Sequence, residues 1–336
     1  MRSVATKPVD PAQAKLLAAA RDGDERAFSQ LVGPYERELH QHCYRMLGSV
    51  HDADDVMQES LVRAWSSIGR FDGRQAVRPW LYKIATNRCL TALASRRRRE
   101  LPTDLSPGAV PTPQTEWLEP YQDVRLGVDA LGPEARVLAR ERVELAFMAA
   151  LQQLSALQRA VLVLREVMDF PAHEVADLLD TSVASVNSAL QRARTVIRRR
   201  TPSRSQQQEL ADLGPEVRAL AGRYAAAWEA SDVEGVVAML AEDVRLAMPP
   251  ILTWYDGLPA VRAALAASPL THRWRLLPTW ANGQPAFGCY RWYERRGRFV
   301  GEGMNVLTVQ DGRITAITAF ILPDLQPYGL PREISS

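Results

Sequence analysis

The spacing of apolar residues changes character along the chain, and this limits the folds that are possible. Residues 12–99 and 141–200 carry apolar residues at intervals of three and four, as amphipathic helices do. Residues 101–133, between them, contain six prolines and few periodic apolar positions, which is typical of a linker. After residue 205, two helical stretches, 215–240 and 258–267, precede strand-like runs. The pattern predicts a multidomain chain with two all-α blocks followed by an α+β domain.

Turn signals divide the C-terminal part into hairpins. Asn282-Gly283, Arg296-Gly297 and Asp311-Gly312 interrupt alternating runs at hairpin spacing. This predicts a curved antiparallel sheet closed by helices, a cone that commonly encloses a pocket. The candidate pocket residues are aromatic or apolar, and they would otherwise simply fill a core: Trp254, Tyr255, Trp280, Trp292, Met304 and Phe320.

Composition places the chain among ordinary globular proteins. It has 336 residues, of which 46% are hydrophobic and 24% charged. No apolar run is long enough to span a membrane, and residues 1–10 lack the apolar core of a signal peptide, so a cytoplasmic location without membrane contact is expected. Cys43, Cys89 and Cys289 are odd in number and far apart, which favours reduced thiols.

The net charge of +2 conceals two basic clusters. Arginines gather at 96–99 and again at 192–200, each at the end of a predicted helix. Such clusters suit contact with a polyanion, although cations also stabilise a helix C-terminus without any partner.

A helix is predicted after Asp52, which would be its N-cap. Its apolar face runs from Met57 to Ile68, and its other face carries acidic and amide side chains. A loop with Phe71, Gly73 and Arg74 follows, and Pro79 then stands where a first-turn proline would.

Residues 170–197 predict two helices separated by a break at 180–182, which is helix-turn-helix spacing. The outward side chains of the second helix are short or forked hydrogen-bonding groups suited to base edges and phosphates: Ser185, Ser188, Gln191 and Arg192, with Asn187 at the flank. The same geometry also occurs in proteins that never touch DNA.

These motifs together resemble a known family. Residues 28–99, with the runs 52–65 and 79–87, resemble region 2 of extracytoplasmic-function (ECF) sigma factors, and residues 147–200, with the run 154–159, resemble their region 4. The tail from about residue 213, with the runs 227–232 and 254–257, is similar to SnoaL-like domains of the NTF2-like fold. Residues 117–121 resemble the linker of the sigma factors that carry this tail.

The resemblance implies a domain plan. Region 2, a helical bundle for core polymerase and the −10 element, would span 12–100, followed by a Pro-rich linker at 101–140. Region 4, the helix-turn-helix for the −35 element, would span 141–202, and the SnoaL-like cone 210–330.

The resemblance also assigns a polymerase-binding surface. The acidic and apolar helix at 54–68 would dock on the clamp helices of the largest polymerase subunit, using Asp54, Asp55, Gln58, Glu59, Leu61 and Trp65. A solvated helix N-terminus is the alternative for the acidic residues.

For the −10 element, Trp80, Lys83 and Asn87 stand at i, i+3 and i+7, so one helical stripe offers a stacking surface, a cation and an amide. In this family the preceding loop captures a flipped base. The implied −10 contacts are Phe71, Arg74, Trp80, Lys83, Asn87, Arg88, Arg96 and Arg97. Trp80 would alternatively belong to the core.

For the −35 element, the second helix of the helix-turn-helix would enter the major groove. Ser185, Asn187, Ser188, Gln191 and Arg192 would lead, with Arg194 and Arg198 on phosphates. No catalysis, cofactor or metal is needed, because the polymerase makes the phosphodiester bond. A conventional DNA-binding regulator that recruits no polymerase is the rival interpretation.

The family places a regulatory module in the tail, and an intramolecular contact with the sigma domains and an unidentified small-molecule ligand are expected. The alternative is a small-molecule-binding or catalytic domain of the cyclase, isomerase or hydrolase kind. Acid–base chemistry would have to come from His272, Asp256, Glu302 or Asp324. His40, His42 and Cys43 are crowded and lack a fourth zinc ligand.

Overall fold

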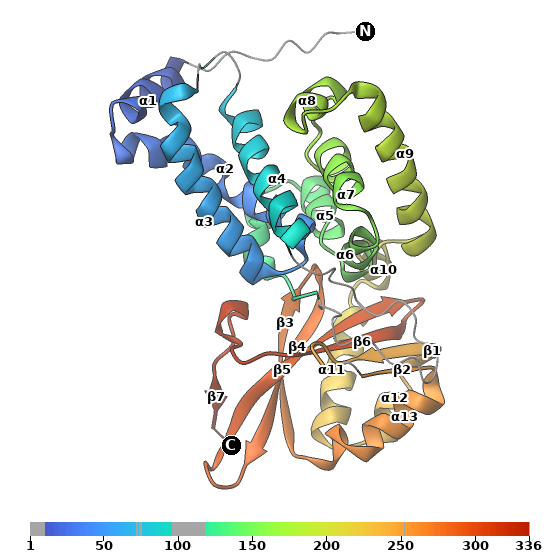
Figure 1. Ribbon diagram of the computed structural model, residues 1–336. Coiled ribbons are helices and arrows are strands. Elements are labelled where there is room, and N and C mark those ends of the chain that lie inside the picture. Colours follow the sequence, from blue (N-terminus) through green and yellow to red (C-terminus); the bar gives the residue numbers. More distant parts are fainter. Residues whose placement is uncertain (1–10, 72, 74–75, 96–117, 252, 336) are drawn as a thin grey trace. The chain divides into compact units, whose positions relative to one another are not determined.

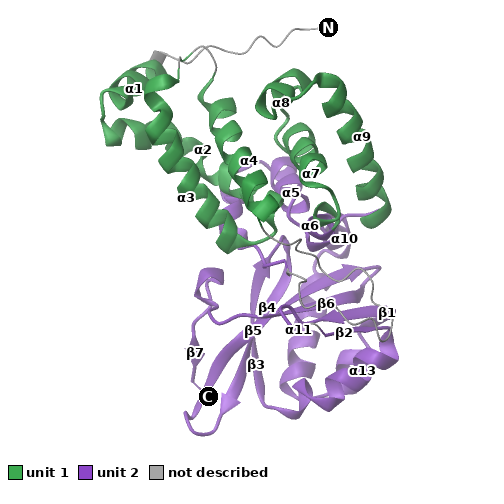
Figure 2. Cartoon of the chain, in the orientation of Figure 1, with its two compact units in different colours: residues 1–99, 150–201 green, residues 100–149, 202–336 purple. Residues whose placement is uncertain are grey.

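The computed structural model describes residues 11–71, 73, 76–95, 118–251 and 253–335. The predicted contacts Arg74, Arg96 and Arg97 lie outside these residues. The chain forms two compact units, a helical unit of residues 1–99 and 150–201 and a sheet unit of residues 100–149 and 202–336 (Figure 2). Among the described helices, none is both long and apolar enough to cross a membrane.

The first part of the helical unit is a bundle of α1 (Pro11–Arg21), α2 (Glu25–Leu47), α3 (Val50–Ser67) and α4 (Val77–Ser95), shown in Figure 1. The N-cap predicted for α3 is wrong. Ser49 is the cap, and its hydroxyl accepts a hydrogen bond from the Asp52 amide at 3.1 Å. Asp52 lies in the first turn, because Gly48 takes a left-handed φ of 76° and ends α2 directly before Ser49.

The second part contains α7 (Ala156–Leu162), a π-helical turn (Val163–Val167), α8 (Ala172–Leu178) and α9 (Val183–Arg200). The short α6 (Leu145–Gln152) precedes them. The break between α8 and α9 is where the sequence predicts it. Asp180 adopts a left-handed φ of 48°, and Ser182 caps α9. The predicted helix-turn-helix is therefore present.

The sheet unit contains a seven-stranded sheet in the order β2-β1-β6-β5-β4-β3, with β7 paired to β5. The strands are β1 (Leu240–Ala247), β2 (Trp254–Asp256), β3 (Trp274–Ala281), β4 (Gln284–Tyr293), β5 (Arg298–Gln310), β6 (Arg313–Ile321) and β7 (Glu333–Ile334). Strands β3 to β6 form the predicted antiparallel meander, and β1 joins β6 in parallel. The Asn282-Gly283 and Asp311-Gly312 turns have positive φ at both residues, as tight hairpins require.

Helices cover one face of this sheet: α11 (Glu216–Glu229), α12 (Val233–Val237) and α13 (Leu258–Ala267) (Figure 1). The single helix expected at 215–240 is divided. Ser231 takes a left-handed φ of 54°, and the Asp232 carboxylate then caps α12 through the Gly235 amide, so α11 stops before residue 230. Leu240 already belongs to β1.

The segment between the two helical blocks is not an extended linker from residue 118 on. It forms two 3-10 turns (Asp123–Leu126 and Val128–Ala130) and α5 (Pro133–Glu141), and Gln122 makes a β-bridge to Ala281. This segment and α10 (Gln206–Leu213) belong to the sheet unit. The sequence pattern does not predict this arrangement, because hydrogen bonds to the edge of a sheet, unlike the packing of an amphipathic helix, do not require a periodic apolar face.

Candidate nucleic-acid interface

The loop before α4 and the start of α4 bring together the two aromatic residues expected at the −10 element. Phe71 and Trp80 stack with ring centroids 4.7 Å apart and planes 26° from parallel. Phe71 is buried and Trp80 half-buried, so one edge of the pair is accessible. An offset aromatic pair of this kind is a ready surface for a third ring.

The polar part of the −10 stripe lies further along α4. Asn87 is exposed, and the Arg88 guanidinium pairs with the Glu59 carboxylate at 2.7 Å. The Lys83 ammonium lies 2.7 Å from the Asp180 carboxylate and donates to the Asp177 carbonyl at 2.9 Å. Lys83, a predicted DNA contact in the part that resembles region 2, is thus ion-paired with a carboxylate in the part that resembles region 4.

The site prediction missed a cluster at the start of α4, formed by Arg78 with the rings of Tyr82 and Phe170. Arg78 pairs with Glu38 at 2.9 Å, and its guanidinium lies 4.6 Å from the Phe170 ring centroid and 5.0 Å from that of Tyr82. Arg78 also donates to the Met168 carbonyl at 3.3 Å. No local signal marks the whole cluster, because Glu38 is 40 residues from Arg78 and Met168 is 90 residues from it.

The polymerase-binding residues predicted on α3 form one mixed surface. Asp54 lies 3.0 Å from the His40 ring and Asp55 3.8 Å from that of His51, while Gln58 and Glu59 are exposed. Leu61 and Trp65 are half-buried, and Trp65 packs edge-on against Phe28 at 5.1 Å. Val62, which the prediction omitted, is 66% exposed and adds an apolar group beside the acids.

Helix α9 presents its predicted polar face to solvent. Asn187, Ser188, Gln191, Arg192, Arg194 and Arg198 are exposed, and Ser185 is half-exposed. The Ser185 amide donates to the capping Ser182 hydroxyl at 3.1 Å, and Arg192 donates to Ser188 at 2.7 Å. Val186, Ala189, Leu190 and Ala193 are buried on the other face, which fixes the orientation of the helix.

The six candidate pocket residues are not brought together. Met304 and Phe320 belong to a buried cluster on the sheet face away from α11, and Trp292 packs against that cluster. Tyr255 packs against the other cluster, beneath α11 and α13, and Trp254 lies half-buried beside it in β2. Trp280 is 40% exposed, with the Arg140 guanidinium 5.5 Å from its ring. Alternation along the strands explains the division, because neighbouring side chains point to opposite faces.

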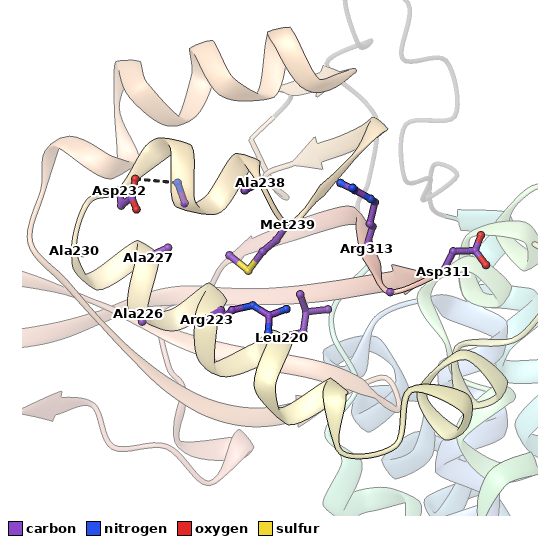
Figure 3. Close-up of a pocket in the computed structure, with 12 residues that line it drawn as sticks. Leu220, Arg223, Ala226, Ala227, Ala230, Asp232, Ala238, Met239, Asp311 and Arg313 are labelled. Atoms are coloured by element: carbon purple, nitrogen blue, oxygen red, sulfur yellow. Dashed lines mark hydrogen bonds between the residues drawn. The ribbon is translucent and has the colours of Figure 1, made fainter.

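A pocket of about 710 Å³ lies elsewhere in the sheet unit, between α11, α12 and the turn joining β5 to β6 (Figure 3). Ala226, Ala227, Ala230 and Ala238 give it a shallow apolar wall, and Arg223 and Arg313 supply cations. A small-molecule ligand for this domain stays a prediction.

The acid–base candidates of the tail are dispersed, and most are engaged in ion pairs. Asp256 pairs with Arg245 at 3.3 Å, Glu302 with Arg291 at 3.0 Å and Asp324 with Arg332 at 3.4 Å. His272 is exposed and lies outside these pairs. Among the described residues, no cluster of three or more His, Cys, Asp or Glu side chains is arranged to hold a metal.

Family models match three parts of the chain: Sigma-70 region 2 at 31–99, Sigma-70 region 4 at 144–196 and a SnoaL-like domain at 221–317. The chain is 43% identical over 331 residues to the ECF RNA polymerase sigma factor SigG of Mycobacterium tuberculosis, covering 94% of this chain and 86% of that protein. The chain belongs to the ECF RNA polymerase sigma factors.

Further relatives agree with this assignment. The ECF sigma factor SigW of Bacillus subtilis is 31% identical over 185 residues, covering 55% of this chain and 94% of that protein. The crystal structure of the M. tuberculosis ECF sigma factor SigJ matches 89% of this chain and all of that chain, with a TM-score of 0.59 and 25% identity.

The sigma factor therefore carries two all-α sigma regions followed by an NTF2-like domain with a curved sheet, as the sequence predicts. It acts with core RNA polymerase on promoter DNA in transcription initiation and is not an enzyme. Because the chain belongs to this family, the rival interpretation, a conventional DNA-binding regulator that recruits no polymerase, is rejected.

Proposed function

We propose that the stacked pair Phe71 and Trp80, with Lys83 and Asn87 on the same stripe of α4, receives the −10 element. The stack supports this role, because a base that leaves the duplex needs a ring against which to lie. Asn87 would contact a base edge, and Lys83 and Arg88 would bind phosphates. The exposed face of α9 would read the −35 element through Gln191 and its neighbours. The mixed acidic and apolar face of α3 would bind core polymerase.

We also propose that the SnoaL-like domain regulates initiation by holding the connecting segment, residues 118–149, which runs from the end of the linker into the start of region 4. Asn282 supports this role: its carboxamide accepts from the Tyr121 amide at 2.7 Å and donates to the Val143 carbonyl at 2.7 Å. The Gln284 carboxamide likewise accepts from the Leu145 amide at 2.9 Å. Two side chains of the β3–β4 hairpin thus bond the connecting segment at three backbone positions.

A buried acid of the same segment, Glu144, also bonds it to α10. The Glu144 carboxylate accepts from the amides of Gln206 and Gln207, both at 3.0 Å, at the start of α10. The Gln206 carboxamide in turn bonds both backbone groups of Val309 in β5. A domain that holds the connecting segment in this way would limit the positions open to regions 2 and 4. The protein would work in the cytoplasm, where core polymerase and the promoter meet.

The experiment that tests the promoter roles is reconstitution. Core polymerase is incubated with the sigma factor, and the initiated transcripts are sequenced to define the promoter. Trp80→Ala should lower open-complex formation at least tenfold, whereas Trp80→Tyr, which keeps a ring, should retain most of it. Lys83→Ala is compared with Lys15→Ala on the exposed face of α1. Equal activity of the two lysine variants would remove Lys83 from the proposed interface.

A further inference from the structure

Within the helical unit, an acidic residue of region 4 forms an ion pair with a lysine of region 2. Lys83 lies on α4, and Asp180 lies in the turn before the recognition helix α9. Their charged groups are 2.7 Å apart, and the Asp177 carbonyl completes the site at 2.9 Å. The ammonium therefore has a carboxylate oxygen and a carbonyl oxygen as partners, and a charge-assisted hydrogen bond to an anionic oxygen is also what a DNA phosphate would offer it.

An apolar contact also joins α4 to the segment before α8. Tyr82 of α4 packs edge-on against Phe170 at 5.0 Å, and its hydroxyl lies 3.0 Å from the Met168 sulfur. Tyr82, Phe170 and Met168 are all buried. Arg159 of α7, 2% exposed, donates to the Met46 carbonyl of α2 and to Gln152. Regions 2 and 4 thus share a core in the helical unit.

This shared core is incompatible with simultaneous reading of both promoter elements. Elements at −10 and −35 lie about 25 base pairs apart, about 85 Å of duplex at ~3.4 Å per base pair. A compact unit of about 150 residues is only about 40 Å across. The contact between α4 and the turn before α9 must therefore open before the promoter is bound.

We propose that Asp180 is an intramolecular mimic of a DNA phosphate that keeps Lys83 occupied in the closed state. The proposal rests on the proposed role of Lys83 at the −10 element. Lys83 is 40% exposed and Asp180 74%, so their ion pair is weak and water-accessible. The ion pair competes with a phosphate for Lys83 and adds little to the cost of opening the shared core.

The test compares Asp180→Asn with Asp169→Asn in the full chain. Asp169 is a matched control: it lies in the same unit, has a left-handed φ of 58°, and makes no ion pair within the described residues. Asparagine tolerates this backbone conformation at both positions. The probe is a fluorescent single-stranded oligonucleotide carrying the −10 sequence found by transcript sequencing, and binding is measured by anisotropy.

The expected result is a two- to fivefold tighter binding for Asp180→Asn and unchanged binding for Asp169→Asn. In the double variant Lys83→Ala and Asp180→Asn, the gain should disappear. A gain that persists without Lys83, or equal affinities for both asparagine variants and the original chain, would overturn the proposal. Asp180→Gly and Asp169→Gly repeat the comparison with the residue that best suits positive φ, in case the asparagine variant folds poorly.

Failure of the promoter assignment would look different. If Lys83→Ala binds the oligonucleotide as tightly as Lys15→Ala, Lys83 has no role at the −10 element. The proposal that Asp180 mimics a DNA phosphate is then wrong as well. If Lys83→Ala weakens binding and Asp180→Asn does not strengthen it, only the mimic is wrong.

Discussion

At the scale of single residues, the helical unit contains a buried histidine whose state depends on its surroundings. His42 of α2 is fully buried, and its Nε2 lies 2.9 Å from the Thr86 hydroxyl of α4. Burial, together with the positive charges of Arg45 and Arg78, lowers the pKa of His42 to about 3. The ring is therefore neutral in the folded unit and links α2 to α4 through its hydrogen bond with Thr86.

This pKa predicts acid sensitivity. Below pH 6.5 the unfolded chain binds a proton at His42 that the folded unit excludes down to about pH 3, so stability falls as the pH is lowered through this window. The loss attributable to His42 should be about 1.4 kcal/mol per pH unit. His42→Gln keeps a hydrogen-bonding amide and cannot titrate. Urea unfolding at pH 7.5 and 5 should show a smaller drop for His42→Gln than for the original chain.

The exposed His173 of α8 supplies the control. His173→Gln should leave the pH dependence unchanged. An equal effect of both substitutions would show that the pH dependence of the unfolding free energy comes from the overall charge of the protein and not from burial of His42.

Two residues of the recognition helix separate base reading from phosphate binding. Gln191 and Arg198 are both exposed on α9. Gln191→Ala should change which −35 sequences are preferred, because it removes an amide that can read a base edge, at a cost of about 1–3 kcal/mol. Arg198→Ala should weaken all sequences alike and lower the salt slope by about one. Binding of a randomised −35 library at two salt concentrations distinguishes the two outcomes.

At the scale of elements, the first amides of α10 donate hydrogen bonds to the buried carboxylate of Glu144. Burial raises the pKa of Glu144 to about 7, against the two amide donors that lower it. Burial likewise raises the pKa of Asp123 to about 6, although the Gly283 amide at 2.8 Å and Arg140 favour its charged form. Both acids lie in the connecting segment and bond it to other parts of the sheet unit, Glu144 to α10 and Asp123 to the β3–β4 turn, so both contribute to the proposed hold on that segment.

These two acids predict the opposite pH dependence from His42. Their pKa values are higher in the folded unit than the ordinary 3.8 and 4.5, so the folded form binds more protons between about pH 4 and 7. The sheet unit should lose stability as the pH rises through that window, by up to about 1.4 kcal/mol per pH unit for each group. Hydrogen exchange of the α10 amides at pH 5.5 and 8 measures this. Slower exchange at pH 8, after correction for intrinsic rates, would contradict it.

At the scale of the whole molecule, the chain enters the sheet unit twice, once between regions 2 and 4 and once after region 4. Leu118, Tyr121 and Leu145 are 1%, 0% and 3% exposed, and hydrogen bonds to Asn282 and Gln284 hold the backbone at Tyr121 and Leu145. The SnoaL-like domain therefore completes the fold of the connecting segment, residues 118–149, and its removal should affect more than the tail.

Deletion of residues 205–336 tests this consequence. Without the sheet, residues 118–149 lose the partners of their buried side chains, so protease cleavage there should become at least tenfold faster. Transcription from the mapped promoter should also change. If cleavage and transcription both match the full chain, the domain does not govern the connecting segment. Region 2 cleavage serves as the internal reference, since its bundle contains its own core.

The sequence by itself determined the modules and the local elements. The three- and four-residue spacing of α3 and α9, the break at Asp180 and the Asn-Gly and Asp-Gly hairpins are local patterns, and local backbone physics sets them. The tertiary structure decided which of those elements meet. Lys83 and Asp180 are 97 residues apart, and Tyr121 and Asn282 are 161 apart. Such contacts depend on packing across the whole unit, because a hydrogen bond between distant residues leaves no periodic trace in either segment.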